Sequence, residues 1–202
     1  MPDHDGFRVL RVDLRSHNIT RSGDLGGPQL AIAYGAGGVW VIGADNSLRR
    51  LDPTTLEVTA TVDGVATSYE GYEPKIVLAQ GGVWVSDALS HSVARVDPGR
   101  LQVTYRRGLA GDGIAFGAGA IWSADGKSSV WRLSGDAAQR IRAGAGAIDV
   151  AAGPRSVWVV NWRGHTLVRI DASRRRAVRR FSLGREPVAV AFGGGYLGVV
   201  VR

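Results

Sequence analysis

The feature that most constrains the fold of this chain is a pair of short motifs that recur in alternation. The first motif is a glycine turn followed by an aliphatic segment with a tryptophan. Its copies occupy 33–41, 78–85, 115–122 and 151–159, and a last copy at 191–199 has no tryptophan. The repeat tryptophans, Trp40, Trp84, Trp122 and Trp158, are separated by 44, 38 and 36 residues. A regular period of this length indicates a chain assembled from repeated supersecondary units.

The second motif places an arginine two positions before an aspartate or serine. It reads RVLRVD at 8–13, SLRRLD at 47–52, SVARVD at 92–97, SVWRLS at 129–134 and TLVRID at 166–171. The Asp-Pro pair at 52–53 predicts a type I turn, because proline fixes φ at the second turn position. A spacing of two puts the arginine and the aspartate on the same face of a strand. We therefore expect this pair to make hydrogen bonds between neighbouring units.

Each repeat of about 40 residues predicts a four-stranded antiparallel meander, whose strands we name a, b, c and d in chain order. One such sheet cannot bury both of its faces, and packing sheets face to face around an axis solves this, as in a β-propeller. The N-terminus supplies only strands c and d, and the C-terminus only strands a and b. Pairing of these two halves would close the ring without free sheet edges.

We therefore predict one all-β domain over 1–202, a five-bladed β-propeller of four-stranded antiparallel blades. It is closed by N-terminal strands c and d pairing with C-terminal strands a and b. The predicted half-blades are 7–28 and 188–202, and the predicted full blades are 29–74, 75–112, 113–147 and 148–187. The alternative is a piece of a six- or seven-bladed ring.

The segments GAGGVWV…LRRLDPTTLEV and PKIVLAQGGVWVSDALSHSVARVDP resemble YVTN-type bacterial β-propeller repeats and the related streptogramin (virginiamycin B) lyase-like propellers. The resemblance covers nearly the whole chain. It implies a fold shared by extracytoplasmic binding proteins, sensor domains of bacterial regulators or kinases, and some enzymes. The streptogramin lyases imply a histidine and glutamate set with magnesium in the last blades. Here 188–202 contains no histidine or carboxylate, and His165 and Glu186 stand in no matching motif, so no catalytic residue is assigned.

Composition removes several other classes. There is no cysteine, which excludes disulfides, thiolate zinc sites and a cysteine nucleophile. The start of the chain does not have the pattern of a signal peptide, and no apolar run approaches the roughly 20 residues of a membrane span. We therefore expect a cytoplasmic protein or a part of a larger bacterial protein. Gly-x-Ser-x-Gly and phosphate-cradling loops are missing, and no cofactor or metal is predicted.

Strands b and c, and strands d and a, are joined by loops that share one face of a propeller, around the mouth of its channel. These loops are polar and irregular, so we predict that they bind a small molecule or a protein. Trp162 could stack on a ring-shaped ligand, or pack against its neighbouring blade. His91 and His165 occupy equivalent positions and are interpreted as turn caps. The candidate ligand-binding residues are Tyr69, Glu70, Tyr72, Glu73, Asp87, His91, Asp125, Lys127, Asn161, Trp162, His165 and Glu186.

The sequence thus favours a monomeric, non-catalytic binding, interaction or sensor module. The alternative is a metal-assisted lyase or hydrolase resembling the streptogramin lyases. A further alternative is nucleic-acid binding, since the chain carries a formal charge of +7 and a basic cluster in its last c–d turn and strand d. A charged edge strand is the commoner explanation of such a cluster. The cluster consists of Arg174, Arg175, Arg176, Arg179 and Arg180.

Overall fold

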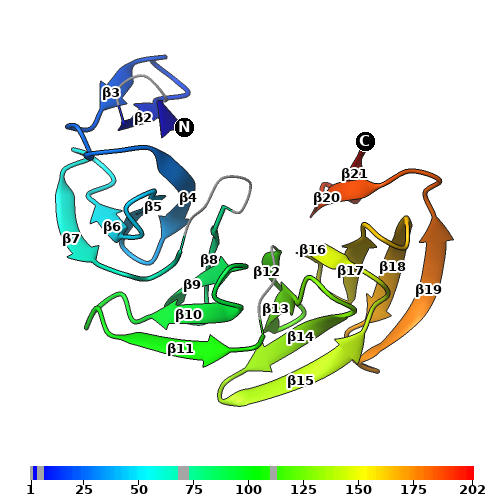
Figure 1. Ribbon diagram of the computed structural model, residues 1–202. Coiled ribbons are helices and arrows are strands. Elements are labelled where there is room, and N and C mark those ends of the chain that lie inside the picture. The colour runs from blue at the N-terminus through cyan, green and yellow to red at the C-terminus, as the bar shows by residue number, and fades with distance from the viewer. Residues whose placement is uncertain (1, 4–6, 68–72, 110–112) are drawn as a thin grey trace. The chain divides into compact units, whose positions relative to one another are not determined.

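The structure is a computed structural model that describes residues 2–3, 7–67, 73–109 and 113–202. The described residues form strands, turns and loops, without a helix (Figure 1). Within that part of the chain, nothing helical is long and apolar enough to cross a membrane. The chain divides into two compact units. Unit 1 comprises Met1–Val85 and Ala94–Thr104, and unit 2 comprises Ser86–Val93 and Tyr105–Arg202.

Unit 1 contains a small N-terminal sheet and a complete meander. The small sheet has the order β1-β2-β3, and the meander has the order β4-β5-β6-β7 with antiparallel pairing. The strands are β1 (Pro2–Asp3), β2 (Arg8–Val12), β3 (Ile19–Arg21), β4 (Gln29–Gly35), β5 (Gly38–Gly43), β6 (Leu48–Leu51) and β7 (Val58–Val62).

A second meander has the order β11-β10-β9-β8, and the division between the units falls within it. Unit 2 then continues with two further antiparallel meanders and a two-stranded sheet, β20-β21. The strands are β8 (Lys75–Ala79), β9 (Gly82–Asp87), β10 (Ser92–Val96), β11 (Val103–Arg107), β12 (Ile114–Gly117), β13 (Ala120–Ala124), β14 (Ser129–Ser134), β15 (Ala137–Arg142), β16 (Ala147–Ala152), β17 (Ser156–Asn161), β18 (Thr166–Asp171), β19 (Arg176–Ser182), β20 (Pro187–Gly193) and β21 (Tyr196–Val201). The described residues thus contain four four-stranded meanders, as the repeats predict.

The tryptophan of the first motif fixes the turn between strands a and b. Trp40, Trp84 and Trp122 are almost fully buried, and each indole N–H donates to the main-chain carbonyl five residues earlier, at 2.9–3.1 Å. This bond lets a large side chain enter the core without leaving its only polar atom unpaired. The glycine turn therefore recurs with the tryptophan because the two are physically linked.

The arginine and the aspartate of the second motif have different roles. Arg11 donates to the carbonyls of Pro53 and Thr54, at 3.1 and 2.9 Å, and so links β2 to the turn that joins β6 to β7. The expected contact between units of the repeat is therefore present here. The aspartates do not take part in it. Asp52 instead accepts the main-chain N–H groups of Thr54 and Thr55 in its own turn, at 2.7 and 2.9 Å.

The predicted closure of the ring is not confirmed. β20 and β21 form a two-stranded sheet of their own, and β2 and β3 belong to a separate three-stranded sheet. The partner of β2 is β1, which pairs Pro2 with Val9 and Asp3 with Arg8. The short N-terminal strand thus occupies part of the β2 edge that the prediction assigned to a C-terminal strand.

Candidate functional site

A cavity of about 240 Å³ in unit 2 gathers residues from the loops of two successive meanders. We call it the loop pocket. His91 comes from the β9–β10 loop, and Gly108 follows β11. The remaining lining residues come from the β13–β14 loop and from the two strands after it, and they are Asp125, Lys127, Trp131 and Arg140. Three of the predicted ligand residues, His91, Asp125 and Lys127, therefore line one cavity.

Asp125 fixes the shape of this pocket. Its carboxylate is 8% exposed, and Oδ1 accepts the main-chain N–H groups of Lys127, Ser128 and Ser129 at 2.8–2.9 Å. Oδ2 lies 3.6 Å from Nη2 of Arg140. A carboxylate with this many donors is held in one position, and it holds the β13–β14 loop in turn.

Arg140 and Trp131 form the strand side of the loop pocket. They are opposed on neighbouring strands, β15 and β14. The Arg140 side chain is 54% exposed, and its Nε donates to Oγ of Ser129 at 2.9 Å. The indole nitrogen of Trp131 is buried and has no hydrogen-bond partner among the described residues. The two side chains thus bring a cation and an aromatic ring to the same cavity.

The two candidate histidines serve their loops through the main chain. His91 and His165 have φ of 49° and 47°, the left-handed region. Their carbonyls accept the N–H groups of Gly108 and Leu183, which anchors each d–a loop to the b–c loop of the same sheet. This agrees with their interpretation as turn residues. Both imidazoles remain exposed, and only His91 lines the loop pocket.

Other candidates are engaged in local structure. Asp87 is buried and accepts the N–H groups of Leu89 and Ser90 at 3.0 and 3.2 Å. Asn161 is fully buried, and its amide donates to the Ala143 carbonyl and to Oγ1 of Thr166, both at 3.2 Å. These two side chains hold loops in place and do not present polar atoms to solvent.

The two remaining candidates of unit 2, Trp162 and Glu186, also have partners. Trp162 lies against Gly146, and the guanidinium of Arg163 stands 4.8 Å from its ring centroid. Glu186 accepts a hydrogen bond from Nε of Arg202 at 3.0 Å. Glu73 is exposed. Tyr69, Glu70 and Tyr72 lie outside the described residues.

The histidine and carboxylate set of a metal-assisted lyase does not come together in the part of the chain that the structure describes. No group of three or more His, Cys, Asp or Glu residues there is arranged to hold a metal ion. Of the residues that the sequence nominated for such chemistry, Glu70 is outside the described ranges, and Glu186 is paired with Arg202.

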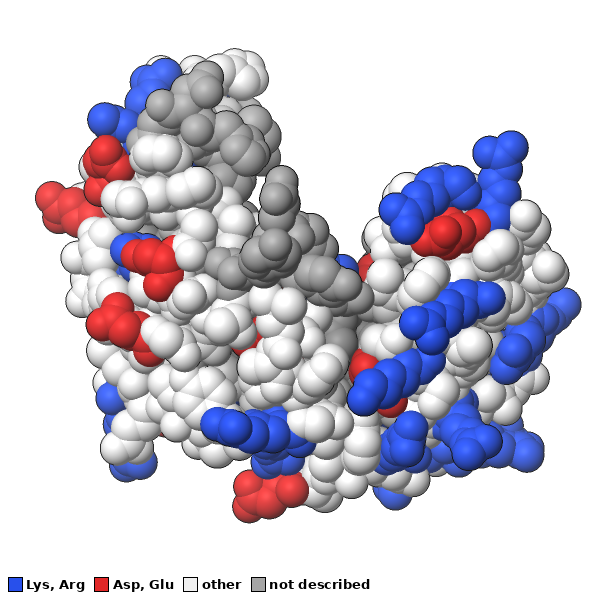
Figure 2. All heavy atoms as spheres, viewed as in Figure 1, with Lys and Arg blue, Asp and Glu red and all other residues white. Residues whose placement is uncertain are grey.

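The basic cluster lies in the β18–β19 turn and along β19, and all five of its arginines are exposed. Arg174 pairs with Asp171 at 3.0 Å, and Arg179 stacks 4.8 Å from the Phe181 ring centroid. Charge is unequal between the units, because unit 2 has 16 Lys and Arg against 7 Asp and Glu, and unit 1 has 9 against 11. Figure 2 shows basic side chains distributed over the visible face of unit 2.

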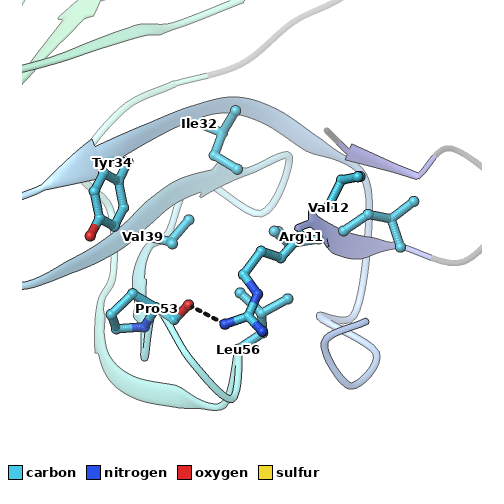
Figure 3. Close-up of a pocket in the computed structure, with 9 residues that line it drawn as sticks. Arg11, Val12, Ile32, Tyr34, Val39, Pro53 and Leu56 are labelled. Carbon is cyan, nitrogen blue, oxygen red and sulfur yellow. Dashed lines mark hydrogen bonds between the residues drawn. The ribbon is translucent and has the colours of Figure 1, made fainter. Parts of the chain in front are cut away.

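A second cavity, of about 380 Å³, lies in unit 1, and we call it the apolar pocket. Figure 3 shows Arg11 reaching across it to the Pro53 carbonyl, with Ile32 and Tyr34 on the opposite wall. Tyr34 and Val12 are 77% and 51% exposed, which is unusual for apolar side chains at a cavity. Sequence reasoning missed this pocket, because its residues come from strands and from the β6–β7 turn, and not from the loops that are predicted to bind a ligand.

Trp131 and Arg140 were missed as well, although one of them leaves a signal in the sequence. Trp131 takes the position that precedes the repeat arginine, where the other copies have Leu10, Arg49, Ala94 and Val168. A bulky aromatic residue that breaks a repeat is a better candidate for function than a residue that follows it, because the repeated positions serve the fold. Arg140 lies on a strand outside both motifs, and the sequence offers no comparable signal for it.

Solved structures with similar folds are β-propeller proteins. The structure of U3-55K and that of the RRP9 WD40 repeats each give a TM-score of 0.75 at 13% identity, covering 98% of this chain and 68% of theirs. BamB from Moraxella catarrhalis gives 0.67 at 11% identity, covering 97% of this chain and 62% of its own. The chain thus spans roughly two thirds of these proteins and shares the β-propeller type of fold.

No protein-family model and no curated protein sequence matches this chain. The resemblance to YVTN-type repeats therefore stays a prediction. At 11–13% identity, the structural likeness describes the fold alone.

Proposed function

We propose that this chain is a non-catalytic binding module and that the loop pocket is its recognition site. The observation that carries the proposal is the convergence of His91, Asp125 and Lys127 with Trp131 and Arg140 around one cavity. Loop composition alone predicts three of these positions as ligand residues. Polar groups that converge on a preformed cavity with an aromatic wall are the usual signature of a ligand site.

The way the pocket is built supports a binding role. Its floor is fixed by the hydrogen bonds of Asp125, and its strand side is part of a four-stranded sheet. A preorganised site loses little conformational entropy when it binds. Binding of a partner protein is also compatible with this type of fold. A chain of the solved nidogen/laminin complex is similar to this chain, with a TM-score of 0.63 at 11% identity, over 91% of this chain and 76% of that one.

We also propose that the functional ring has five blades and is closed by β21 pairing with β2. The support is the register of the meanders, in which the tryptophan of strand b is opposite the arginine of strand c, as in Trp122 with Arg132 and Trp158 with Arg169. Gly198 holds the tryptophan position of β21, because it is opposite Ala191 as Trp158 is opposite Ala151. The same register would therefore set Gly198 opposite Arg11. The blade bounds would then be those that the repeats predict.

Neither alternative activity gains a specific observation. A lyase would need a histidine and carboxylate cluster, which the described residues do not assemble. For nucleic-acid binding, the arginines of the basic cluster are spread over an exposed outer strand, and Arg174 and Arg179 already have intramolecular partners.

The binding role is tested by ¹⁹F NMR on protein labelled with 5-fluorotryptophan. The chain contains six tryptophans. The Trp131 signal is assigned with Trp131→Phe. A chemically defined panel of neutral sugars, nucleosides, amino acids, carboxylic acids and phosphate esters is then titrated. We expect at least one compound to shift the Trp131 signal saturably. Lys127→Ala should lower the affinity for this compound more than Arg142→Ala does, because Arg142 is an exposed residue of β15 outside the pocket. A panel without any such compound would overturn the proposal.

A further inference from the structure

We propose that the loop pocket recognises an oxyanion, a carboxylate or phosphate group, held by Arg140 and Lys127 beside the Trp131 ring. This inference rests on the proposed binding function and adds the chemical class of the ligand. It starts from the side chains that line the cavity. Lys127, Arg140 and His91 supply N–H donors, and Asp125 is the only carboxylate among the described lining residues.

Asp125 does not act as an open acceptor in this cavity. One of its oxygens receives three main-chain N–H groups, and the other faces the guanidinium of Arg140. An ionised carboxylate has about four lone-pair sites, so most of its capacity is already used. A cationic ligand would have to compete with these donors for Asp125, whereas an anionic ligand would not need it.

Lys127 and Arg140, the two basic side chains of the loop pocket, keep N–H donors available for a ligand. Among the described residues, Lys127 forms no salt bridge, and its side chain is exposed. Arg140 donates Nε to Ser129 and remains half exposed, so part of its five-donor guanidinium is available. An arginine and a lysine that converge on one cavity favour a carboxylate or phosphate, because charge-assisted bonds of this type are short and strong.

Trp131 adds an independent observation. Its indole nitrogen is buried and has no acceptor among the described residues, although buried N–H groups are nearly always paired. Trp131 lines the cavity, and an oxyanion is the type of acceptor that its N–H lacks. The rest of the indole would give an apolar wall for the body of the ligand.

The net positive charge of unit 2 also favours an anionic ligand. Its excess of Lys and Arg over Asp and Glu, 16 against 7, raises the local concentration of anions around any cavity on its surface. This long-range attraction is weakened by salt. The short contacts inside the pocket are weakened less, so binding at fixed ionic strength separates the two contributions.

The test uses the full chain, labelled with ¹⁵N, and follows the indole N–H signal of Trp131. Inorganic phosphate and sodium acetate are titrated separately against sodium chloride at constant ionic strength, which distinguishes a phosphate from a carboxylate site. We expect a saturable shift of the Trp131 indole signal with a dissociation constant in the millimolar range for at least one of the two probes, and no shift with chloride.

The matched variants are Arg140→Ala and Arg142→Ala. Both arginines lie on β15 and are exposed, and both changes remove one positive charge, but only Arg140 lines the pocket. We expect Arg140→Ala to weaken binding by about tenfold or more and Arg142→Ala by less than about twofold. Asp125→Asn retains an oxygen acceptor for the loop and removes a negative charge, so it should strengthen anion binding by about three- to tenfold.

Arg140→Lys is the second variant, in case the alanine change disturbs the fold. It keeps the charge and loses the planar fork, so we expect an intermediate affinity. Equal affinities of Arg140→Ala and Arg142→Ala, weaker binding by Asp125→Asn in a folded protein, or no shift with either anion would each overturn the inference. Binding of only neutral compounds at Trp131 would reject the oxyanion and leave the proposed binding function intact.

Discussion

Arg50 donates a hydrogen bond of 3.0 Å from its guanidinium to the main-chain carbonyl of Pro98, which lies 48 positions further along the chain. The same guanidinium stands 5.7 Å from the ring centroid of Trp40. One side chain therefore joins the tryptophan of its own sheet to the turn of the next repeat. Arg11 makes the corresponding bonds to Pro53 and Thr54. The repeat arginine is a structural element of this fold.

Replacing Arg50 with alanine should destabilise the protein. The change removes the hydrogen bond to Pro98 and the contact with Trp40, which together are worth about 1–2 kcal/mol. The free energy of unfolding, measured by urea denaturation, should fall by this amount. Arg100→Ala removes an exposed arginine whose side chain makes no hydrogen bond in the described structure, and it should change stability by less than about 0.5 kcal/mol. Equal effects of the two changes would refute the linking role.

A second prediction concerns the packing of Trp162 on Gly146. Gly146 has φ of +76°, and a Cβ there would lie 2.6 Å from the Trp162 ring and 2.8 Å from the Arg163 nitrogen. Gly146→Ala should therefore destabilise the protein by about 1–3 kcal/mol more than Gly195→Ala, measured as the difference in free energy of unfolding. Gly195 has a similar φ of +81° and open space around it.

The Trp162→Ala background identifies the cause of this difference. Removing the indole should reduce the excess cost of Gly146→Ala, because one of the two close contacts disappears with it. The same excess in both backgrounds would mean that the Arg163 main chain alone is responsible. In either case one side of the Trp162 ring packs against Gly146. The sequence could not decide between packing and ligand stacking for this residue.

The four meanders could be predicted from sequence because each repeat is locally self-consistent. The tryptophan demands a core position and an acceptor, and the glycine turn supplies that acceptor at the fifth residue before it. The division of labour between arginine and aspartate could not be predicted. A spacing of two gives a shared strand face, but it does not say that Asp52 turns back to cap its own turn.

The candidate site was predictable only in part, for a related reason. Loop composition gives residue types, and so it identified His91, Asp125 and Lys127. It does not tell which loops of neighbouring sheets meet, and it carries no information about strand residues such as Arg140. Whether Asp87 and Asn161 face solvent or the core also depends on loop conformation, which their sequence neighbours do not determine.

The aspartate caps predict the dependence of stability on pH. Main-chain N–H groups of Ser16, Thr55 and Arg100 lower the pKa values of Asp13, Asp52 and Asp97. The N–H of Arg174, followed by the Ser173 hydroxyl, lowers the pKa of Asp171 to about 2. Because the folded pKa lies below the unfolded value of about 3.9, this stabilisation is present above about pH 4 and is lost as the pH falls toward 2.

The thermal midpoint should therefore fall steeply between about pH 4 and about pH 2. Asp171→Asn keeps an oxygen acceptor for the turn but no longer titrates, so it should flatten this slope. Asp63→Asn, at an exposed aspartate without a described side-chain hydrogen bond, should leave the slope unchanged. An identical slope in wild type and Asp171→Asn would contradict the assignment.

The last prediction concerns closure of the ring, which depends on the strand that pairs with the edge of β2 away from β3. The register of the complete meanders would set Gly198 opposite Arg11, with Val200 opposite Val9 and Val201 opposite Arg8. β1 already pairs with Val9 and Arg8. The N-terminal strand and β21 therefore compete for one set of main-chain donors and acceptors. Removing Pro2 and Asp3 should favour the closed ring.

A disulfide tests this directly, because the chain has no native cysteine. Opposed strand residues have Cα atoms about 4.5–5.5 Å apart, within the range that a disulfide spans. Leu197 would lie opposite Val12 in this register. Val12→Cys with Leu197→Cys should therefore form an intramolecular bond under mild oxidation, faster without Pro2 and Asp3, and should raise the thermal midpoint. Leu14→Cys with Leu197→Cys, offset beyond the end of β2, should not. Covalent dimers would instead indicate strand pairing between two copies, and a failure of both pairs to react would show that β21 does not complete the β2 sheet.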